Sequence, residues 1–186
     1  MSLLKFESML KTNNVYFFDL VEFEEIIIHY LDAGKVSLAK KAIKLGLEQH
    51  PASVDLKLLM VELYITDNEV DKASNLLKKI EKIAPTNDEV FIQKATISSK
   101  KGKHKEAIDH LNKFSSSSEL FGPTKHGLMG DAYSELGDYS AAAAQYEKAA
   151  AASKNEFTAP KYLKKAGLVY EELGETSKAL IAYNKV

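Results

Sequence analysis

The chain has 186 residues and contains neither cysteine nor arginine. The lack of cysteine excludes disulfide frameworks, thiolate zinc sites and thiol nucleophiles. All 25 residues counted as lysine or arginine are lysines, and they nearly balance 26 acidic residues. Arginine is the usual bidentate reader of guanine, phosphate and carboxylate groups, so its absence argues against specific nucleic-acid binding and arginine-finger chemistry.

Long apolar stretches are also missing. The composition is 45% hydrophobic and 27% charged, and Lys5, Glu7 and Lys11 interrupt the N-terminal region, which excludes a signal-peptide core there. We therefore expect a soluble chain without a membrane span, located in the cytoplasm. An upstream signal or anchor would instead place it in the envelope or periplasm.

Motifs for catalysis and metal binding are not found. The five histidines are scattered over different repeats, and we expect none to form the i, i+4 pair with a carboxylate that metal ligation on a helix needs; they are His29, His50, His104, His110 and His126. The sequence has no glycine-rich phosphate loop and no serine nucleophile elbow. These absences predict that the protein is not an enzyme and uses neither a metal nor a cofactor.

A repeat is the main feature that the sequence does contain. Identical residues lie 34 positions apart in three pairs: Tyr30 and Tyr64, Ala39 and Ala73, Pro51 and Pro85. The same step leads to Gly102 and Ala107 in a third copy. A fourth copy follows at a step of 35 residues and contains Gly130, Tyr133, Gly137, Ala142, Tyr146 and Ala149. A fifth follows at a step of 37 residues and contains Gly167, Tyr170, Gly174, Ala179 and Tyr183. A period of this length indicates stacked copies of one small structural unit.

Each copy has the pattern of two short helices. Apolar residues recur at spacings of three and four, which predicts amphipathic helices rather than strands. The expected helices cover about 20–33, 36–49, 53–66, 70–83, 87–100, 104–116, 122–136, 139–153, 159–173 and 176–186, after a leading helix or strap at 2–12. Between the paired helices stand residues that adopt the left-handed conformation that ends a helix: Gly34, Asn68, Gly102, Gly137 and Gly174.

The small residue, the tyrosine three positions later and the alanines that follow resemble the tetratricopeptide repeat in its bacterial form. The resemblance covers residues 20–186 and is strongest at 130–137 and 165–174, whereas the first three copies are degenerate and no copy has the family's tryptophan. It implies an all-α fold, a right-handed α-solenoid of about five helical hairpins.

The expected domain organisation has four parts within one continuous solenoid. Residues 1–19 form a leading segment, 20–114 the first three repeats, 115–122 a serine-rich seam, and 123–186 the last two repeats, the fifth being incomplete. The seam contains a low-complexity run of four serines, Ser115, Ser116, Ser117 and Ser118. It is interpreted either as a turn between unequal repeats or as the junction of two distinct repeat arrays in a chimera.

The resemblance also implies a binding surface. In tetratricopeptide arrays the first helices of successive repeats line a concave groove, and this alignment places ten residues there: Glu24, Ile28, Leu58, Glu62, Ile92, Thr96, Gly127, Asp131, Lys164 and Leu168. This set is mainly acidic and aliphatic, so the lysine and asparagine clamp that binds carboxylate tails in part of the family is expected to be absent. The groove instead suits an extended or helical peptide with basic and aliphatic side chains.

We therefore expect a non-catalytic protein-interaction module that binds a peptide or a partner helix. One alternative is an architectural subunit that forms a homo-oligomer end to end, and another is the regulatory repeat domain of a larger protein. The fifth repeat supports end-to-end association because its second helix would expose an apolar set: Leu180, Ile181, Tyr183 and Val186.

Two other clusters each have two interpretations. The lysine-rich turn, with Lys94, Lys100, Lys101, Lys103 and Lys105, is either solvated or a contact for RNA, anionic lipid or an acidic protein. Its lack of interleaved aromatic residues favours the solvated turn. The aromatic run Tyr16, Phe17 and Phe18 either packs under the leading segment or contacts a partner.

Overall fold

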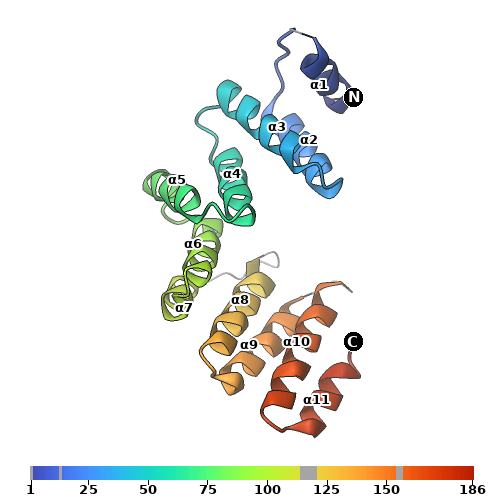
Figure 1. The fold of residues 1–186 in the computed structure, drawn as a ribbon, viewed down its shortest axis with the longest axis vertical. Coiled ribbons are helices and arrows are strands. Elements are labelled where there is room, and N and C mark those ends of the chain that lie inside the picture. The colour runs from blue at the N-terminus through green and yellow to red at the C-terminus, as the bar shows by residue number, and fades with distance from the viewer. Residues whose placement is uncertain (1, 13, 114–120, 154–156) are drawn as a thin grey trace. The chain divides into compact units, whose positions relative to one another are not determined.

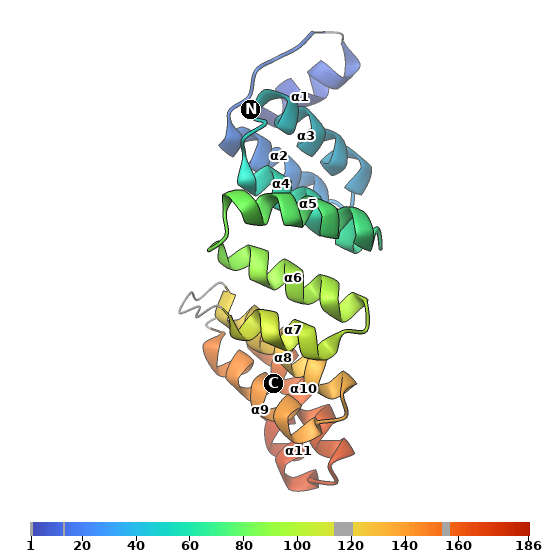
Figure 2. The same cartoon turned by 90° about the vertical axis from the view of Figure 1, so that its left-hand side faces the viewer.

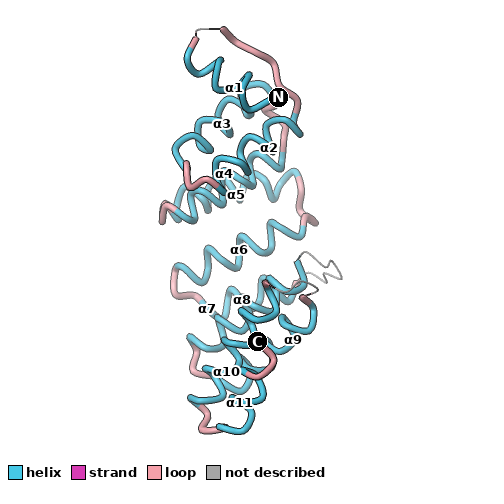
Figure 3. The backbone as a smooth tube through the Cα atoms, turned by 90° about the vertical axis from the view of Figure 1, so that its right-hand side faces the viewer, coloured by secondary structure: helices cyan, strands magenta, loops and turns pink. Residues whose placement is uncertain are grey.

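The computed structural model describes residues 2–12, 14–113, 121–153 and 157–186. These residues form eleven α-helices and no strand, so the all-α prediction is confirmed (Figures 1 and 3). The chain divides into two compact units, Met1–Ala84 and Pro85–Val186. Successive helices pack in pairs as hairpins within each unit, which is the helical repeat structure that the periodicity predicts.

The first unit contains α1 (Ser2–Lys11), α2 (Leu20–Asp32), α3 (Val36–Gln49), α4 (Val54–Thr66) and α5 (Val70–Ile83). The second contains α6 (Asp88–Lys100), α7 (His104–Asn112), α8 (Phe121–Glu135), α9 (Tyr139–Ala152), α10 (Thr158–Glu172) and α11 (Thr176–Tyr183). Helices α2 and α3 form one hairpin, as Figure 2 shows, and α4 with α5, α6 with α7, α8 with α9 and α10 with α11 form the others.

The predicted seam at 115–122 stays a prediction, because most of it lies outside the described residues. Its serine run lies outside the described residues, while Phe121 and Gly122 begin helix α8. The boundary between the two compact units lies elsewhere, between Ala84 and Pro85, near the end of the second repeat.

The five hairpin turns share one geometry, as the sequence predicted. Gly34, Gly102, Gly137 and Gly174 have φ between 68° and 76°, and Asn68 has φ 61°. At Gly137 the backbone N–H donates to the Ser134 carbonyl at 3.0 Å, and the next N–H, of Asp138, donates to the Tyr133 carbonyl at 3.0 Å. This pair of bonds is the Schellman motif, which satisfies the last carbonyls of a helix, and it recurs in all five turns.

A β-branched residue should not fit at Gly137. Gly137→Val places a side chain at φ 76°, which is expected to lower the free energy of unfolding by about 1–2 kcal/mol. Asn68→Gly is the control, because it removes a side chain from a backbone that is already left-handed, and it should be neutral or slightly stabilising. Urea unfolding followed by circular dichroism measures both, and equal stability of Gly137→Val and wild type would contradict the assigned turn.

The core of the first unit is built around α1. Phe6 has no exposed surface, and its ring contacts those of Phe18, Phe23 and Tyr30 at centroid distances of 5.7, 6.3 and 6.2 Å. Aromatic pairs at such distances and tilts stabilise a core beyond the area they bury. The leading segment is therefore a structural part of the first repeat, as predicted.

The segment between α1 and α2 is held by side chains of the first hairpin. The Gln49 amide donates to the Tyr16 carbonyl at 2.9 Å and accepts from the Phe18 N–H at 3.0 Å. This double contact fixes the backbone so that Phe18 is buried while Phe17 stays 66% exposed, resting against the His50 ring. The packing interpretation of the aromatic run holds for Phe18 and not for Phe17.

The core of the second unit combines small residues with tyrosines. The repeat alanines Ala107, Ala142 and Ala179 are buried, as their recurrence at the same position of each repeat predicts. Tyrosine rings then cover helical glycines: Tyr146 covers Gly130, Tyr162 covers Gly127, and Tyr183 covers Gly167. An added Cβ at any of these glycines would lie 2.3–2.5 Å from a ring atom, so glycine is required for the close approach.

Candidate functional site

The residues predicted to bind a partner occupy two positions in each repeat. One position lies two residues before the tyrosine near the end of each repeat's first helix, or before the residue that replaces this tyrosine. It comprises Ile28, Glu62, Thr96, Asp131 and Leu168. We call these five residues the outward row, because all of them are exposed or half-exposed. The large aliphatic side chains of Ile28 and Leu168 are 53% and 51% exposed, although water disfavours such exposure.

The second position lies four residues earlier in each helix, and it behaves differently. Leu58, Ile92 and Gly127 are buried, whereas Glu24 is half-buried and Lys164 is exposed. Gly127 lies under Tyr162, and Ile92 packs in the cluster that contains Ala95 and Met129. Within each unit the structure therefore leaves the outward row, together with Glu24 and Lys164, as the side chains that a partner could reach.

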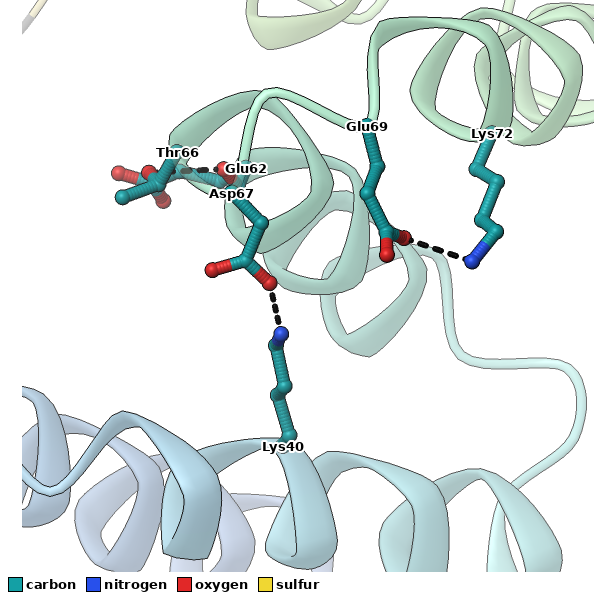
Figure 4. A network of polar contacts seen from close by, with 6 residues as sticks. All are labelled: Lys40, Glu62, Thr66, Asp67, Glu69 and Lys72. Carbon is teal, nitrogen blue, oxygen red and sulfur yellow. Dashed lines mark hydrogen bonds and ion pairs between the residues drawn. The ribbon is translucent and has the colours of Figure 1, made fainter.

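In the first unit, Glu62 is an exposed carboxylate on α4, and polar contacts fix the end of that helix. The Thr66 hydroxyl donates to the backbone carbonyl of Glu62 at 3.0 Å, and Lys40 from α3 forms an ion pair with Asp67 (Figure 4). Among the described residues, no side chain pairs with the Glu62 carboxylate itself. A basic group from outside the chain could therefore bind it without displacing an internal cation.

In the second unit, Asp131 joins three helices. Its Oδ1 accepts from the Tyr146 hydroxyl of α9 at 2.6 Å and from the Lys165 ammonium of α10 at 2.5 Å. Burial, and then the hydrogen bond to Asp131, raises the pKa of Tyr146 well above its usual range. Asp131 therefore has a structural role, and with 43% of its side chain exposed it also presents negative charge to solvent.

Tyr170 and Glu147 form a second link of this kind. The Tyr170 hydroxyl on α10 donates to Glu147 Oε1 on α9 at 2.9 Å. Burial, followed by this carboxylate, raises the pKa of Tyr170 to about 12. Because the folded pKa lies above the unfolded value, the stabilisation is complete below about pH 10 and is lost as pH rises towards 12.

A spectrophotometric titration of tyrosine ionisation tests this link. Tyr170→Phe should remove one ionisation near pH 12, because the wild-type hydroxyl keeps its proton to about that pH. Glu147→Gln removes the negative charge and should move the same ionisation to lower pH. If Tyr170→Phe instead removes absorbance change near pH 10, the assigned hydrogen bond is wrong.

The apolar set predicted at the end of the fifth repeat is only partly accessible. Leu180, Ile181 and Val186 are 60%, 56% and 60% exposed. Tyr183 is half-buried because its ring packs on Gly167 of α10. Three of the four residues are thus available for association, and the fourth stabilises the last hairpin.

The lysine-rich turn and the histidines show local contacts. Lys103 pairs with Glu106 at 3.1 Å, and His110 lies 3.6 Å from the same carboxylate, one turn along α7. Burial and nearby lysines lower the pKa of His110. The expectation that no histidine has a carboxylate four residues away on a helix is therefore wrong, because Glu106 and His110 have this spacing and their side chains meet. The described part of the chain holds no group of three or more residues suited to a metal ion.

Comparison with known proteins identifies the repeat. Tetratricopeptide repeat models match residues 30–95 and residues 128–186. No curated protein sequence matches the chain. Within the described residues, no helix is both long and apolar enough to cross a membrane.

Solved structures with the same fold include three of different origin. One is the APC/C hetero-tetramer Cut9–Hcn1, with a TM-score of 0.75 and 16% identity over 87% of this chain. The matched part is only 32% of the length of the chain in that structure. Another is PilF of Pseudomonas aeruginosa, with a TM-score of 0.72 and 18% identity over 87% of this chain and 72% of that one. MamA of Desulfovibrio magneticus RS-1 has a TM-score of 0.65 and 16% identity over 88% of this chain and 90% of that one. At such identities the likeness establishes the fold alone.

Proposed function

Because the chain belongs to the tetratricopeptide repeat family, whose members are generally protein-interaction scaffolds and typically non-catalytic, we propose that it binds peptide segments of partner proteins through the outward row. The observation that carries this proposal is the exposure of the same repeat position in all five repeats. In each unit this position contains one exposed aliphatic residue and one carboxylate: Ile28 and Glu62 in the first unit, and Leu168 and Asp131 in the second.

The chemistry of the row defines the partner that fits. Exposed Ile28 and Leu168 favour burial against aliphatic side chains of a partner. Each side chain that becomes fully buried contributes about 1.5–3 kcal/mol of favourable free energy to binding. Glu62 favours a lysine or arginine of the partner, and complementary charge contributes to specificity and to the association rate. At Asp131 a basic group of the partner would compete with Lys165, which already pairs with this carboxylate. We therefore propose an extended or helical peptide that carries both basic and aliphatic residues.

Selection from a random peptide library displayed on phage tests this function. We expect wild-type protein to enrich peptides with basic and aliphatic residues, and Glu62→Lys to weaken binding of those peptides about tenfold by removing a favourable charge and adding a repulsive one. Glu62 is exposed, so this variant should keep its circular dichroism spectrum.

The matched control is a variant with glutamine at Lys100, Lys101 and Lys103 in the lysine-rich turn. This control should bind the selected peptides as wild type does. Selection of acidic peptides, or loss of binding only in the lysine-turn variant, would contradict the proposed surface.

A second candidate function is self-association through the last hairpin. It is favoured by one specific observation, the exposure of Leu180, Ile181 and Val186 close together in sequence on α11 and just after it. Covering such residues with a neighbouring surface is favourable, because it removes apolar surface from water. Sedimentation of wild type beside a Leu180→Glu, Ile181→Lys variant tests this candidate, which predicts concentration-dependent association of wild type alone.

A further inference from the structure

The second unit contains a groove between α9 and α11 that the repeat pattern did not reveal. Its volume is about 580 Å³, within the range of binding pockets. The lining is mainly apolar, with Ala150 and Ala151 of α9, Leu163 of α10, and Ile181 and Ala182 of α11. Its one acidic residue is Glu147 of α9, whose carboxylate accepts from the Tyr170 hydroxyl. The three alanines have short side chains, so an entering side chain can approach the helix backbones closely.

Positive charge lines the α11 side of this groove. Lys178 and Lys185 both contribute to the lining. Lys178 pairs with Glu175 at 2.7 Å, whereas the Lys185 side chain is exposed and its ammonium has no hydrogen-bond or ion-pair partner among the described residues. An apolar surface flanked by carboxylates would therefore complement the groove in both polarity and charge.

Helix α2 of the same chain presents such a surface. Val21, Glu25, Ile28 and Asp32 follow one another at spacings of four, three and four residues, so they form one stripe along the helix. Val21 is 62% exposed and Ile28 is 53% exposed, and Glu25 and Asp32 are exposed as well. We call these four residues the α2 ridge.

The charge of α2 strengthens the match. This helix contains Glu22, Glu24, Glu25 and Asp32 but no lysine. Glu22 is used in the capping box with Asp19, whereas no described side chain pairs with Glu25 or Asp32. The two acidic members of the ridge are thus available to the cations of another molecule.

We propose that the α2 ridge of one copy of this chain docks in the α9–α11 groove of a second copy. The inference rests on the second candidate function, self-association, and names the two surfaces involved. Val21 and Ile28 meet the apolar lining, while Glu25 and Asp32 face Lys178 and Lys185. Because the two surfaces differ, the contact is head-to-tail, and growth continues beyond a dimer unless a ring closes.

Single-surface variants isolate the contact. The ridge variant carries Glu25→Lys and Asp32→Lys, and the groove variant carries Ile181→Glu and Lys185→Glu; all four positions are exposed, so folding should be unaffected. Sedimentation velocity at low salt should show wild type associating with rising concentration, and each variant associating at least about tenfold more weakly. Added salt should weaken the wild-type contact. Lys79→Glu on α5, at an exposed lysine outside both surfaces, is the control and should associate as wild type does.

Mixing the two variants gives the decisive result. The ridge variant keeps an intact groove, and the groove variant keeps an intact ridge, so an equimolar mixture should form a 1:1 dimer that does not grow further.

Three results would overturn the inference. If the ridge variant associates as wild type does while Leu180→Glu does not, self-association stands and occurs through the last hairpin alone. If the mixture stays monomeric while wild type associates, other surfaces are responsible. If wild type is monomeric at every concentration and salt tested, the second candidate function fails as well, whereas the peptide-binding proposal is judged by its own selection experiment.

Discussion

Phe6→Ala is expected to lower the free energy of unfolding by about 3–5 kcal/mol, the usual cost of deleting a fully buried aromatic ring. Phe6 has no exposed surface, and its ring contacts three other aromatic residues of the first unit. The cavity left behind would border Phe18, Phe23 and Tyr30, which cannot all move in to fill it because they are held by the first hairpin.

Leu4→Ala on the same helix is the matched control, because Leu4 is 74% exposed. This control should change stability by less than about 0.5 kcal/mol. Urea unfolding followed by circular dichroism measures both variants. A loss below about 1 kcal/mol for Phe6→Ala would show that α1 does not complete the core of the first repeat.

Gly130→Ala on α8 should destabilise the second unit strongly. Its Cβ would lie 2.5 Å from the Tyr146 ring, so the ring must move, and overpacking of this kind costs about 1–3 kcal/mol. Movement of the ring also weakens the hydrogen bond from Tyr146 to Asp131, worth about 1.5–3 kcal/mol because the acceptor is charged. We expect a net loss of about 3 kcal/mol, after the higher helix propensity of alanine is included.

Gly122→Ala provides the same chemical change at the start of the same helix. There the nearest atom to the added Cβ is the Ala152 Cβ at 3.9 Å, an ordinary contact. This control should be neutral or up to about 1 kcal/mol more stable than wild type. Comparable stability of Gly122→Ala and Gly130→Ala in urea would contradict the packing of Tyr146 on α8.

Features that depend on one hairpin could be predicted from the sequence. The turn residues are an example, because a glycine or asparagine between two amphipathic stretches is enough to indicate a left-handed helix end, and Gly34 and Asn68 both adopt it. The cap of α2 is another, since Asp19 accepts from the Glu22 N–H at 2.8 Å, the bond expected of a residue before a helix.

Features that depend on contacts between hairpins could not be predicted in the same way. Leu58, Ile92 and Gly127 fit the pattern of a partner-binding position, yet they are buried. Whether a residue at such a position is buried depends on the helices of the adjacent hairpin. At Gly127 the Tyr162 ring of the next hairpin covers the residue. The periodicity of a single helix contains no information about that neighbour.

One contact between hairpins shows why the repeat step alone is not enough. The side chains of Asp131 and Lys165 meet at 2.5 Å. The repeat step at this point is 37 residues, so Lys165 lies three residues before the position equivalent to Asp131, and the repeat pattern did not single out this ion pair between neighbouring first helices. The α9–α11 groove had a weak signal, the run of alanines at 149–152, whose short side chains leave its lining open.

Chemical-shift mapping with a selected basic and aliphatic peptide tests the central claim most directly. If the outward row binds the peptide, the largest amide shift changes should occur around Ile28 and Glu62 in the first unit or around Asp131 and Leu168 in the second. Glu62→Lys should reduce the changes on α4. Changes concentrated in the lysine-rich turn or on helices α3, α5, α7, α9 and α11, with the outward row unaffected, would contradict the claim.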